Sequence, residues 1–421
     1  MEEVLKESLE VAVQKKKFTK TNYALLTAHG LNDVVSIFIS TFLISYIYSL
    51  SNNYVIDIGL FYFANYLVMA FVYFVTSILI DRTNRINFYR VAIFVKAAFI
   101  LCIVFAGSKL AGIVYLAGAL NGFADGLYWT SYNVMKNELI PNVKVKTYST
   151  AQQVIEKMVN LVVPLILGKL IDVESFKASA IIILVVTVAQ LFSSIFIKSN
   201  RPKDSRFDLK GFIHNIKNLG ERKELVVENI VNAGIYGFLE VLSPINTIII
   251  MIGFDSNFSL GIFKSIASIL SLFYILWLNR MTKPGKRDIY YIVTSILPLI
   301  AAVWMILDLS KFSIITFSML YSVCFAFKNY LFDVFRNDIL KKLDMYDDIA
   351  EFQCGIEVSM EIGRSIMFLI MILSGVVGAL WGTEGILVSL KIIIAVEVVI
   401  FPILNGLLHK YEKKLVKYEL A

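Results

Sequence analysis

Charged residues are scarce in this sequence. Asp, Glu, Lys and Arg make up 17% of its 421 residues, against about 25% in soluble domains. Hydrophobic residues make up 57%, and the mean hydropathy is +0.71. A soluble protein of this length needs more polar surface, whereas long apolar segments suit a bilayer. The sequence therefore predicts a multi-pass integral protein of the cell (plasma or inner) membrane.

Cysteine and histidine are also few, with three of each. Cys102, Cys324 and Cys354 lie far apart within apolar segments, so they form neither a disulfide framework nor a metal-binding spacing. The sequence has no recognisable nucleophile motif with its base, no phosphate-binding glycine loop and no Walker motif. We therefore expect neither enzyme activity nor a bound cofactor or metal.

The net charge of +7 comes from loops between apolar segments. Such loops adhere to anionic lipid, so the expected partner is the bilayer and nucleic acid is not expected. The first twenty residues mix Glu and Lys and lack the apolar core of a signal peptide. They predict a short cytoplasmic tail.

Twelve apolar runs are long enough to span a bilayer as helices, which takes about 20 residues each. They cover 22–50, 53–80, 87–107, 111–136, 148–171, 177–198, 225–252, 257–279, 288–307, 312–335, 350–379 and 384–408. Basic residues concentrate in both tails and in every second loop, and the loops between these are short and nearly neutral. By the positive-inside rule, both termini are predicted to be cytoplasmic.

The longest connection follows the sixth run and divides the chain into two bundles of six helices. The predicted organisation is a tail at 1–21, a first bundle at 22–198, a linker at 199–224, a second bundle at 225–408 and a tail at 409–421. If the bundles are repeats, polar residues should recur at a constant offset. Three acidic pairs do so: Asp33 with Glu240, Asp125 with Asp333, and Glu156 with Glu361, at offsets of 207, 208 and 205 positions.

The loop after the second run reads SILIDRTNRI and contains Asp81, Arg82 and Arg85; a fainter copy, NRMTKPGKR, contains Arg280 after the eighth run. With twelve runs, two halves and a long basic middle loop, the chain resembles the major facilitator superfamily, in which an acidic and basic motif occupies this loop. The resemblance implies two pseudo-symmetric six-helix bundles that rock about a central cavity. It also implies that these charges lock the cytoplasmic gate.

The fifth run contains VPLILGKL, which keeps Pro164 and Gly168 of a pattern often seen in antiporters of this superfamily. The resemblance thus slightly favours export over uptake.

Ionisable residues inside the runs predict the functional sites. Each costs on the order of 2.5–3.5 kcal/mol at a helix centre, so it is expected to face the bundle interior, water or a partner. The resemblance places the first, fourth, seventh and tenth helices around the cavity. The residues expected to line that cavity or to couple protons are His29, Asn32, Asp33, Asp125, Tyr128, Trp129, Glu240, Lys328 and Asp333.

Within this set, His29 and Asp33 lie one turn apart and can share a proton or a hydrogen bond. Glu240 has apolar neighbours, so we expect it to bind the coupling proton and Asp33 to bind the solute. Tyr128 and Trp129 form a possible aromatic wall for an organic cation. Static interhelical hydrogen bonds and simple packing are the structural alternatives for these residues.

Other intramembrane charges are assigned to gates or to lipid. Glu156, Glu361 and Arg364 are expected at the cytoplasmic gate, with Glu361 and Arg364 paired three residues apart. Lys328 and Asp333 are expected to contact other helices. Three further lysines are expected to extend toward the membrane surface from lipid-facing helices: Lys96, Lys264 and Lys391.

These patterns predict a monomeric secondary transporter that moves a small organic or amphipathic solute by alternating access, with proton coupling. Two alternatives remain. A lipid or glycolipid flippase would have a similar polar cavity, and a divalent-metal carrier could use His29 and Asp33 as half of a site.

Overall fold

A computed structural model describes residues 18–140, 144–198, 207–281, 285–343, 345 and 348–418. At positions 81, 145–146, 275, 278–281, 333–338 and 340–342 it describes the backbone without the side chain. Helices make up nearly all of the described chain, which contains no strand.

The first half of the chain contains six rods. Its helices are α2 (Lys20–Ile37), the π-helical segment η1 (Phe38–Leu43), α3 (Ile44–Leu50), α4 (Tyr54–Leu79), α5 (Arg85–Ala106), α6 (Val114–Leu139), α7 (Val145–Val173) and α8 (Phe176–Ile195). The first predicted run is therefore one span, α2–η1–α3, with a wider turn at its centre. Such π turns occur often at functional sites, because they redirect side chains within a helix.

The second half contains six more rods, preceded by the short helix α9 (Leu209–Asn218). Its helices are α10 (Lys223–Leu239), α11 (Leu242–Phe254), α12 (Asn257–Met281), α13 (Asp288–Leu307), α14 (Lys311–Lys342), α15 (Ile349–Ala379) and α16 (Gly382–Lys417). The seventh span breaks between α10 and α11. Pro244 lacks the N–H that would bond to the carbonyl of Glu240, so the helix cannot continue through this turn.

Within the described ranges, ten segments are long and apolar enough to cross a membrane. One of them, 85–139, contains both α5 and α6, and α7 is an additional rod of 29 residues. The described residues thus form twelve rods, which confirms the predicted all-helical, twelve-span fold. Helix α16 runs past its predicted end at 408 because Tyr411 and Leu415 remain buried, with Tyr411 donating to the carbonyl of Leu225 on α10.

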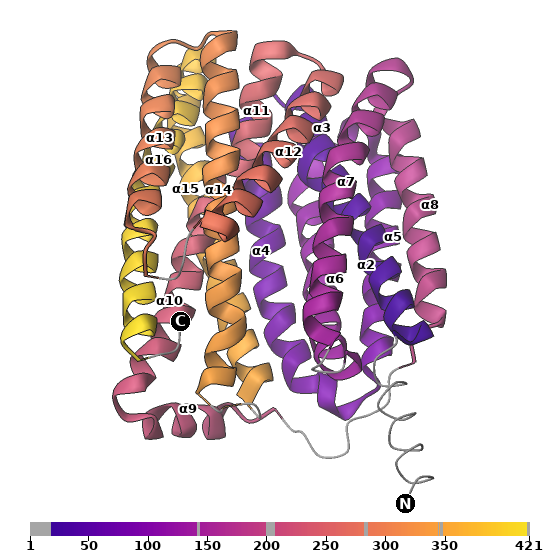
Figure 1. The fold of residues 1–421 in the computed structure, drawn as a ribbon. Coiled ribbons are helices and arrows are strands. Elements are labelled where there is room, and N and C mark those ends of the chain that lie inside the picture. The colour runs from indigo at the N-terminus through magenta and orange to yellow at the C-terminus, as the bar shows by residue number, and fades with distance from the viewer. Residues whose placement is uncertain are drawn as a thin grey trace, which may run out of the picture.

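The two halves stand side by side with α9 across one end (Figure 1). Helices α2–α8, indigo to magenta, form the first half, and α10–α16 form the second. They meet through α4 against α15, α7 against α12, and η1 and α3 against α11. We name the end that holds α9 the inner end and the opposite one the outer end.

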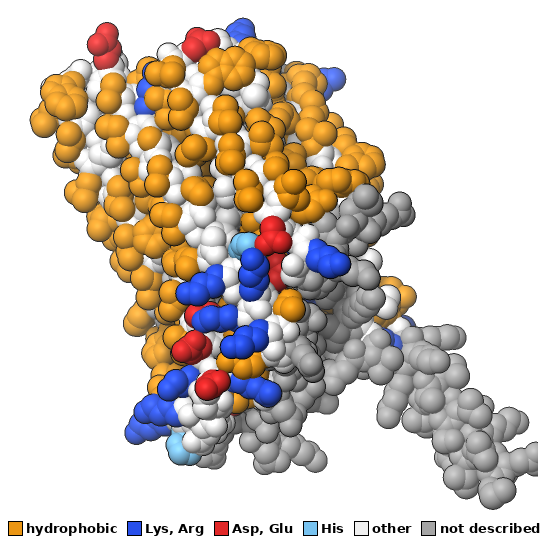
Figure 2. Space-filling view, turned by 60° about the vertical axis from the view of Figure 1, so that its left-hand side comes forward, with side chains coloured by type: hydrophobic (Ala, Val, Ile, Leu, Met, Phe, Trp, Pro, Cys, Tyr) orange, Lys and Arg blue, Asp and Glu red, His pale blue; other side chains and the backbone are white. Residues whose placement is uncertain are grey.

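Hydrophobic side chains cover the flank seen in Figure 2, while most of the charged side chains gather toward the inner end. Exposed hydrophobic residues of α13 and α16 include Ile300, Val303 and Val399. Exposed Lys410 and Lys413 lie in the last turns of α16. An apolar flank of this kind is what a bilayer requires.

Close packing of α6 on α4 positions the cavity wall. A Cβ atom at Gly118 would overlap the carbonyl oxygen of Phe61, and one at Gly122 would overlap that of Asn65. Glycine at these positions lets the two backbones approach directly, as small residues do in membrane helix pairs. This approach brings Asn65 of α4 beside Asn121 of α6.

Candidate functional site

A cavity of about 330 Å³ lies where the two halves meet. Its wall comes from seven of the spans, from both halves, and is formed by Ser36, Ile39, Ser40, Tyr62, Asn65, Tyr66, Met69, Lys96, Asn121, Asp125, Trp129, Glu240, Ser243, Pro244, Phe325 and Arg364. Ile39 and Ser40 belong to the π turn, and Glu240 lies at the break of the seventh span. The irregular backbone therefore occurs at the cavity, where polar groups can be satisfied.

The first half contributes an ion pair to this wall. Lys96 of α5 contacts Asp125 and Asn121 of α6, with Nζ to oxygen distances of 2.6 Å for both. Asn121 also donates to Asp125 (2.9 Å) and to Asn65 (2.6 Å). Lys96 is 4% exposed, so the prediction that it extends toward lipid headgroups is wrong. Its helix turns it inward, and Asp125 compensates its charge there.

The second half contributes a triad of charges. Arg364 of α15 forms ion pairs with Glu240 and with Glu361, one through each terminal nitrogen. The Arg364 guanidinium also lies 5.0 Å from the centre of the Tyr66 ring, across the boundary between the halves. Glu361 is fully buried behind Arg364. The predicted Glu361 and Arg364 pair is therefore present.

The predicted place of this pair is wrong, however. Arg364 lines the central cavity and does not belong to a gate at the helix end. The reason is length: α15 begins at Ile349, so Arg364 lies about 22 Å along its axis at 1.5 Å per residue.

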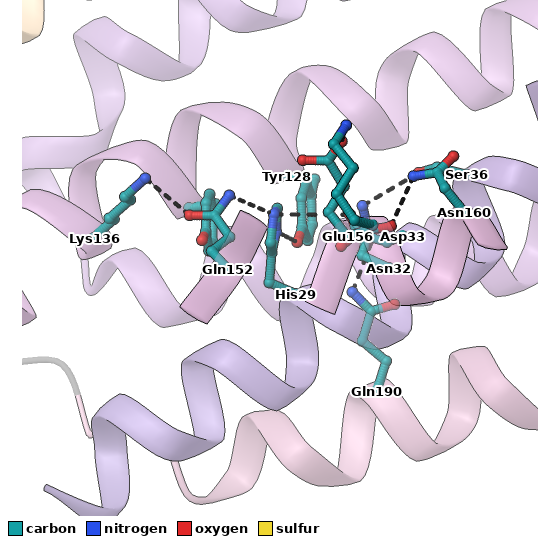
Figure 3. A network of polar contacts seen from close by, with 12 residues as sticks. His29, Asn32, Asp33, Ser36, Tyr128, Lys136, Gln152, Glu156, Asn160 and Gln190 are labelled. Atoms are coloured by element: carbon teal, nitrogen blue, oxygen red, sulfur yellow. Dashed lines mark hydrogen bonds and ion pairs between the residues drawn. The ribbon is translucent and has the colours of Figure 1, made fainter. Parts of the chain in front are cut away.

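A second polar cluster lies inside the first half, between α2, α6, α7 and α8 (Figure 3). The His29 ring lies between aromatic neighbours, stacked on Tyr132 with centroids 4.2 Å apart and edge-on to Trp129 at 5.7 Å. Its Nδ1 is 2.8 Å from the Tyr128 hydroxyl, and its Nε2 is 2.9 Å from Gln152 Nε2. Asp33 Oδ1 lies 3.8 Å from the same Nε2.

Asn32 extends this cluster in two directions. Its side-chain nitrogen is 3.4 Å from Ser36 Oγ, and its oxygen is 3.5 Å from Gln190 of α8. Ser36 lines the central cavity, so the cluster touches the cavity at that residue. The second oxygen of Asp33 is buried without a partner among the described residues.

The structure thus separates the residues that were predicted to share one cavity. Asp125, Trp129 and Glu240 line it, whereas His29, Asn32, Asp33 and Tyr128 belong to the cluster in the first half. Helix α7 packs along this part of α2, so Asp33 faces Glu156 of α7. Glu156 therefore interacts with Asp33 and with Lys157 (3.1 Å), within the first half, and this differs from its predicted role at a gate.

Lys328 lies outside the cavity, fully buried in the second half. It contacts α16, where its Nζ donates to the carbonyl of Phe401 at 3.0 Å and faces the ring of the same residue. It thus contacts another helix, as expected. The side chain of Asp333 lies outside the described part of the chain.

At the inner end, Arg85 forms an ion pair with Glu138 of α6, within the first half. In the corresponding place of the second half, Arg287 contacts Glu412 of α16 at 3.3 Å. Arg82 is exposed, and the side chains of Asp81 and Arg280 lie outside the described residues.

Three residues of the cavity and of the cluster around His29 had no place in the sequence prediction: Asn65, Asn121 and Gln152. The available signal was an amide within an apolar run. The sequence does not say which of these face a partner.

The family model described as Major Facilitator Superfamily matches residues 25–335. In Bacillus subtilis (strain 168), the uncharacterized protein YqgE is 23% identical over 266 residues. That alignment covers 62% of this chain and 61% of YqgE, which is less than two thirds of either.

Solved structures of other transporters share the fold. A bacterial homologue of the iron transporter ferroportin in an inward-facing state has a TM-score of 0.67 at 13% identity, over 93% of this chain and 98% of that one. The nucleoside transporter NupG gives 0.62 at 17% identity, with the same coverage. An inward-facing bacterial homologue of the lysosomal transporter Spinster gives 0.60 at 12% identity, over 94% and 97%. At these identities the likeness concerns the fold alone. Because the family model covers most of the chain, this chain belongs to the Major Facilitator Superfamily of membrane transporters.

Proposed function

We propose that this protein is a monomeric secondary active transporter of the cell membrane, which moves a small organic or amphipathic solute through the central cavity. The observation that supports this best is the makeup of the cavity wall. Each half supplies an ion pair to this wall, Lys96 with Asp125 and Glu240 with Arg364, and the aromatic side chains of Tyr62, Tyr66, Trp129 and Phe325 also line the cavity. A solute held between the two pairs contacts both halves at once, so its binding responds to their relative position.

Alternating access requires contacts that break and re-form at each end. At the outer end, Asp172 of α7 bonds to the first residues of α12, and Ser45 of α3 donates to Asn257 (2.5 Å). These bonds join the halves and close that end. With the inner end at the cytoplasmic side, as the basic loops predict, the structure corresponds to a state closed toward the outside.

We also propose proton coupling through the cluster around Asp33. Asp33 is partly buried and lies away from the cavity wall, and its buried Oδ2 has no partner among the described residues. It adjoins Ser36 through Asn32. Glu240 faces the cavity and is compensated by Arg364. This geometry supports the reverse of the roles expected from sequence: Asp33 binds the proton and Glu240 contacts the solute.

Export is proposed as the direction on the basis of Pro164 and Gly168. Both lie where α7 meets α12: a Cβ at Gly168 would overlap the carbonyl of Asn257, and one at Gly261 would overlap that of Pro164. No contact among the described residues specifically favours a lipid or glycolipid flippase or a divalent-metal carrier. Among the described residues, no three His, Cys, Asp or Glu side chains gather as a metal site.

The test begins with a thermal-shift screen of the purified protein against organic cations, amino acids, sugars, nucleosides and lysolipids. Any hit is then used for transport in proteoliposomes. Lys96→Met and Arg364→Met should abolish its binding, while Lys391→Met should not, because Lys391 lies outside the cavity and bonds to the Ile306 carbonyl (2.7 Å). Unaltered binding in both cavity variants would refute the assigned solute site.

A further inference from the structure

The hydrogen bonds around His29 determine which of its nitrogens holds the proton. Lys136 Nζ lies 2.9 Å from the Gln152 side-chain oxygen, and an ammonium group can only donate. The oxygen of this amide therefore faces Lys136, and its nitrogen faces His29 Nε2 at 2.9 Å. An amide nitrogen also only donates, so His29 Nε2 accepts and has no proton.

The proton must then be on Nδ1, which donates to the Tyr128 hydroxyl at 2.8 Å. His29 is thus neutral and in the Nδ1–H tautomer. Stacking on Tyr132 within 8° of parallel and edge contact with Trp129 keep the ring in this plane. Figure 3 shows Lys136, Gln152 and His29 in one line along the cluster.

This arrangement has a consequence for Asp33. Its Oδ1 lies 3.8 Å from His29 Nε2, which is too far for a hydrogen bond, and Nε2 has no proton to give. If His29 became protonated at Nε2, two donors would face each other, and the Gln152 amide would have to turn away. His29 could then donate to Asp33. The amide of Gln152 and the carboxylate of Asp33 therefore compete for the same ring nitrogen.

We infer that Gln152, oriented by Lys136, is a positioning residue that keeps His29 neutral and apart from Asp33. In the state described here, Asp33 is left as the proton-binding group of the cluster. Release of the Gln152 amide couples the two side chains. We call the hydrogen-bonded series Lys136, Gln152 and His29 the His29 lock. Its role in transport rests on the proposed function, but the tautomer of His29 does not.

The helices packed around the His29 lock also contribute ionisable groups that face it. They are Asp33 on α2, Tyr89 on α5, Tyr128, Tyr132 and Lys136 on α6, and Tyr148, Glu156 and Lys157 on α7; α8 contributes the neutral Gln190. The Lys136 charge opposes protonation of His29, whereas the acids favour it.

The chain has three histidines, so nitrogen NMR can isolate one. In a His214→Gln/His409→Gln background labelled with ¹⁵N-histidine, His29 should give the signals of a neutral Nδ1–H ring at neutral pH. Gln152→Glu keeps the side-chain size but presents only acceptors, so it should convert His29 to the Nε2–H or the doubly protonated form. Lys136→Met should free the amide and weaken the Nδ1–H signature. Gln153→Leu, at an exposed position next to Gln152, is the matched control and should change nothing.

A parent protein whose His29 is Nε2–H or cationic would overturn the inference, as would a Gln152→Glu protein with the parental tautomer. The pH profile of transport in proteoliposomes is the second measurement: Gln152→Glu should shift it and Gln153→Leu should not. A parent protein with the Nδ1–H tautomer would support the His29 lock. If its transport rate did not depend on the pH gradient, however, the coupling role of the lock would be overturned together with proton coupling.

Discussion

Asp172 should control how often the protein opens at its outer end. The Asp172 carboxylate of the first half accepts four hydrogen bonds from the beginning of α12 in the second half. Oδ1 accepts from the backbone and side chain of Asn257 (3.1 and 3.0 Å), and Oδ2 accepts from Ser256 Oγ and the Phe258 backbone (both 2.9 Å). The negative charge also lies at a helix N-terminus, where unpaired N–H groups favour anions.

Asp172→Asn keeps the shape of the side chain but replaces one acceptor oxygen by a donor, which faces donors of α12. Loss of a helix cap costs about 0.5–2 kcal/mol, and loss of the charge at the helix terminus about 0.3–1 kcal/mol. Because Asp172 is solvent-exposed, we take about 1–2 kcal/mol as the total. A change of that size alters the ratio of the two states about 5- to 30-fold in favour of the outward-open one.

Labelling of a cavity residue from outside measures this ratio. Ser243 lines the cavity, so Ser243→Cys is introduced after Cys102, Cys324 and Cys354 have been replaced. The labelling rate with an impermeant maleimide should rise about 5- to 30-fold when Asp172→Asn is added, because the rate follows the population of the open state.

The matched control is Asp57→Asn. Asp57 lies at the same end and accepts from Ser51, but both residues belong to the first half. Its change should leave labelling of the cavity unaltered. Equal labelling rates for parent and Asp172→Asn protein, or an equal rise in the control, would show that the bond between α7 and α12 does not hold the outer end closed.

Three further predictions follow from other parts of the molecule. Asp33→Asn should abolish proton-driven accumulation but preserve solute exchange, whereas Glu240→Gln should weaken solute binding; unchanged driven transport by Asp33→Asn would falsify the coupling role. Gly122→Leu should separate α6 from α4 and lower the free energy of unfolding by about 1–3 kcal/mol, seen as a lower melting temperature, while Gly112→Leu, which has open space around it, should not. Ser205→Cys should react with an impermeant reagent only from the cytoplasmic side, and labelling from outside intact cells would invert the proposed topology.

The sequence alone determined the membrane fold, because hydrophobic runs of about 20 residues admit few structures other than spanning helices. The predicted runs at 257–279 and 350–379 lie within one or two residues of α12 (Asn257–Met281) and α15 (Ile349–Ala379). The pairing of Glu361 with Arg364 was also predictable, since residues three apart in a helix are neighbours whatever surrounds them.

Tertiary structure decided which way the buried charges face. Lys96 and Asp125 lie on different helices, and Gln152 is 123 positions from His29. Hydropathy measures how apolar a segment is, so it cannot show which turn of α2 faces the cavity and which faces α7. The sequence also did not show that Asp33 and Glu240 lie in different sites, although the internal repeat pairs the two residues. Contacts between helices depend on how their backbones pack, and here the glycines of α6 and the break at Pro244 set that packing.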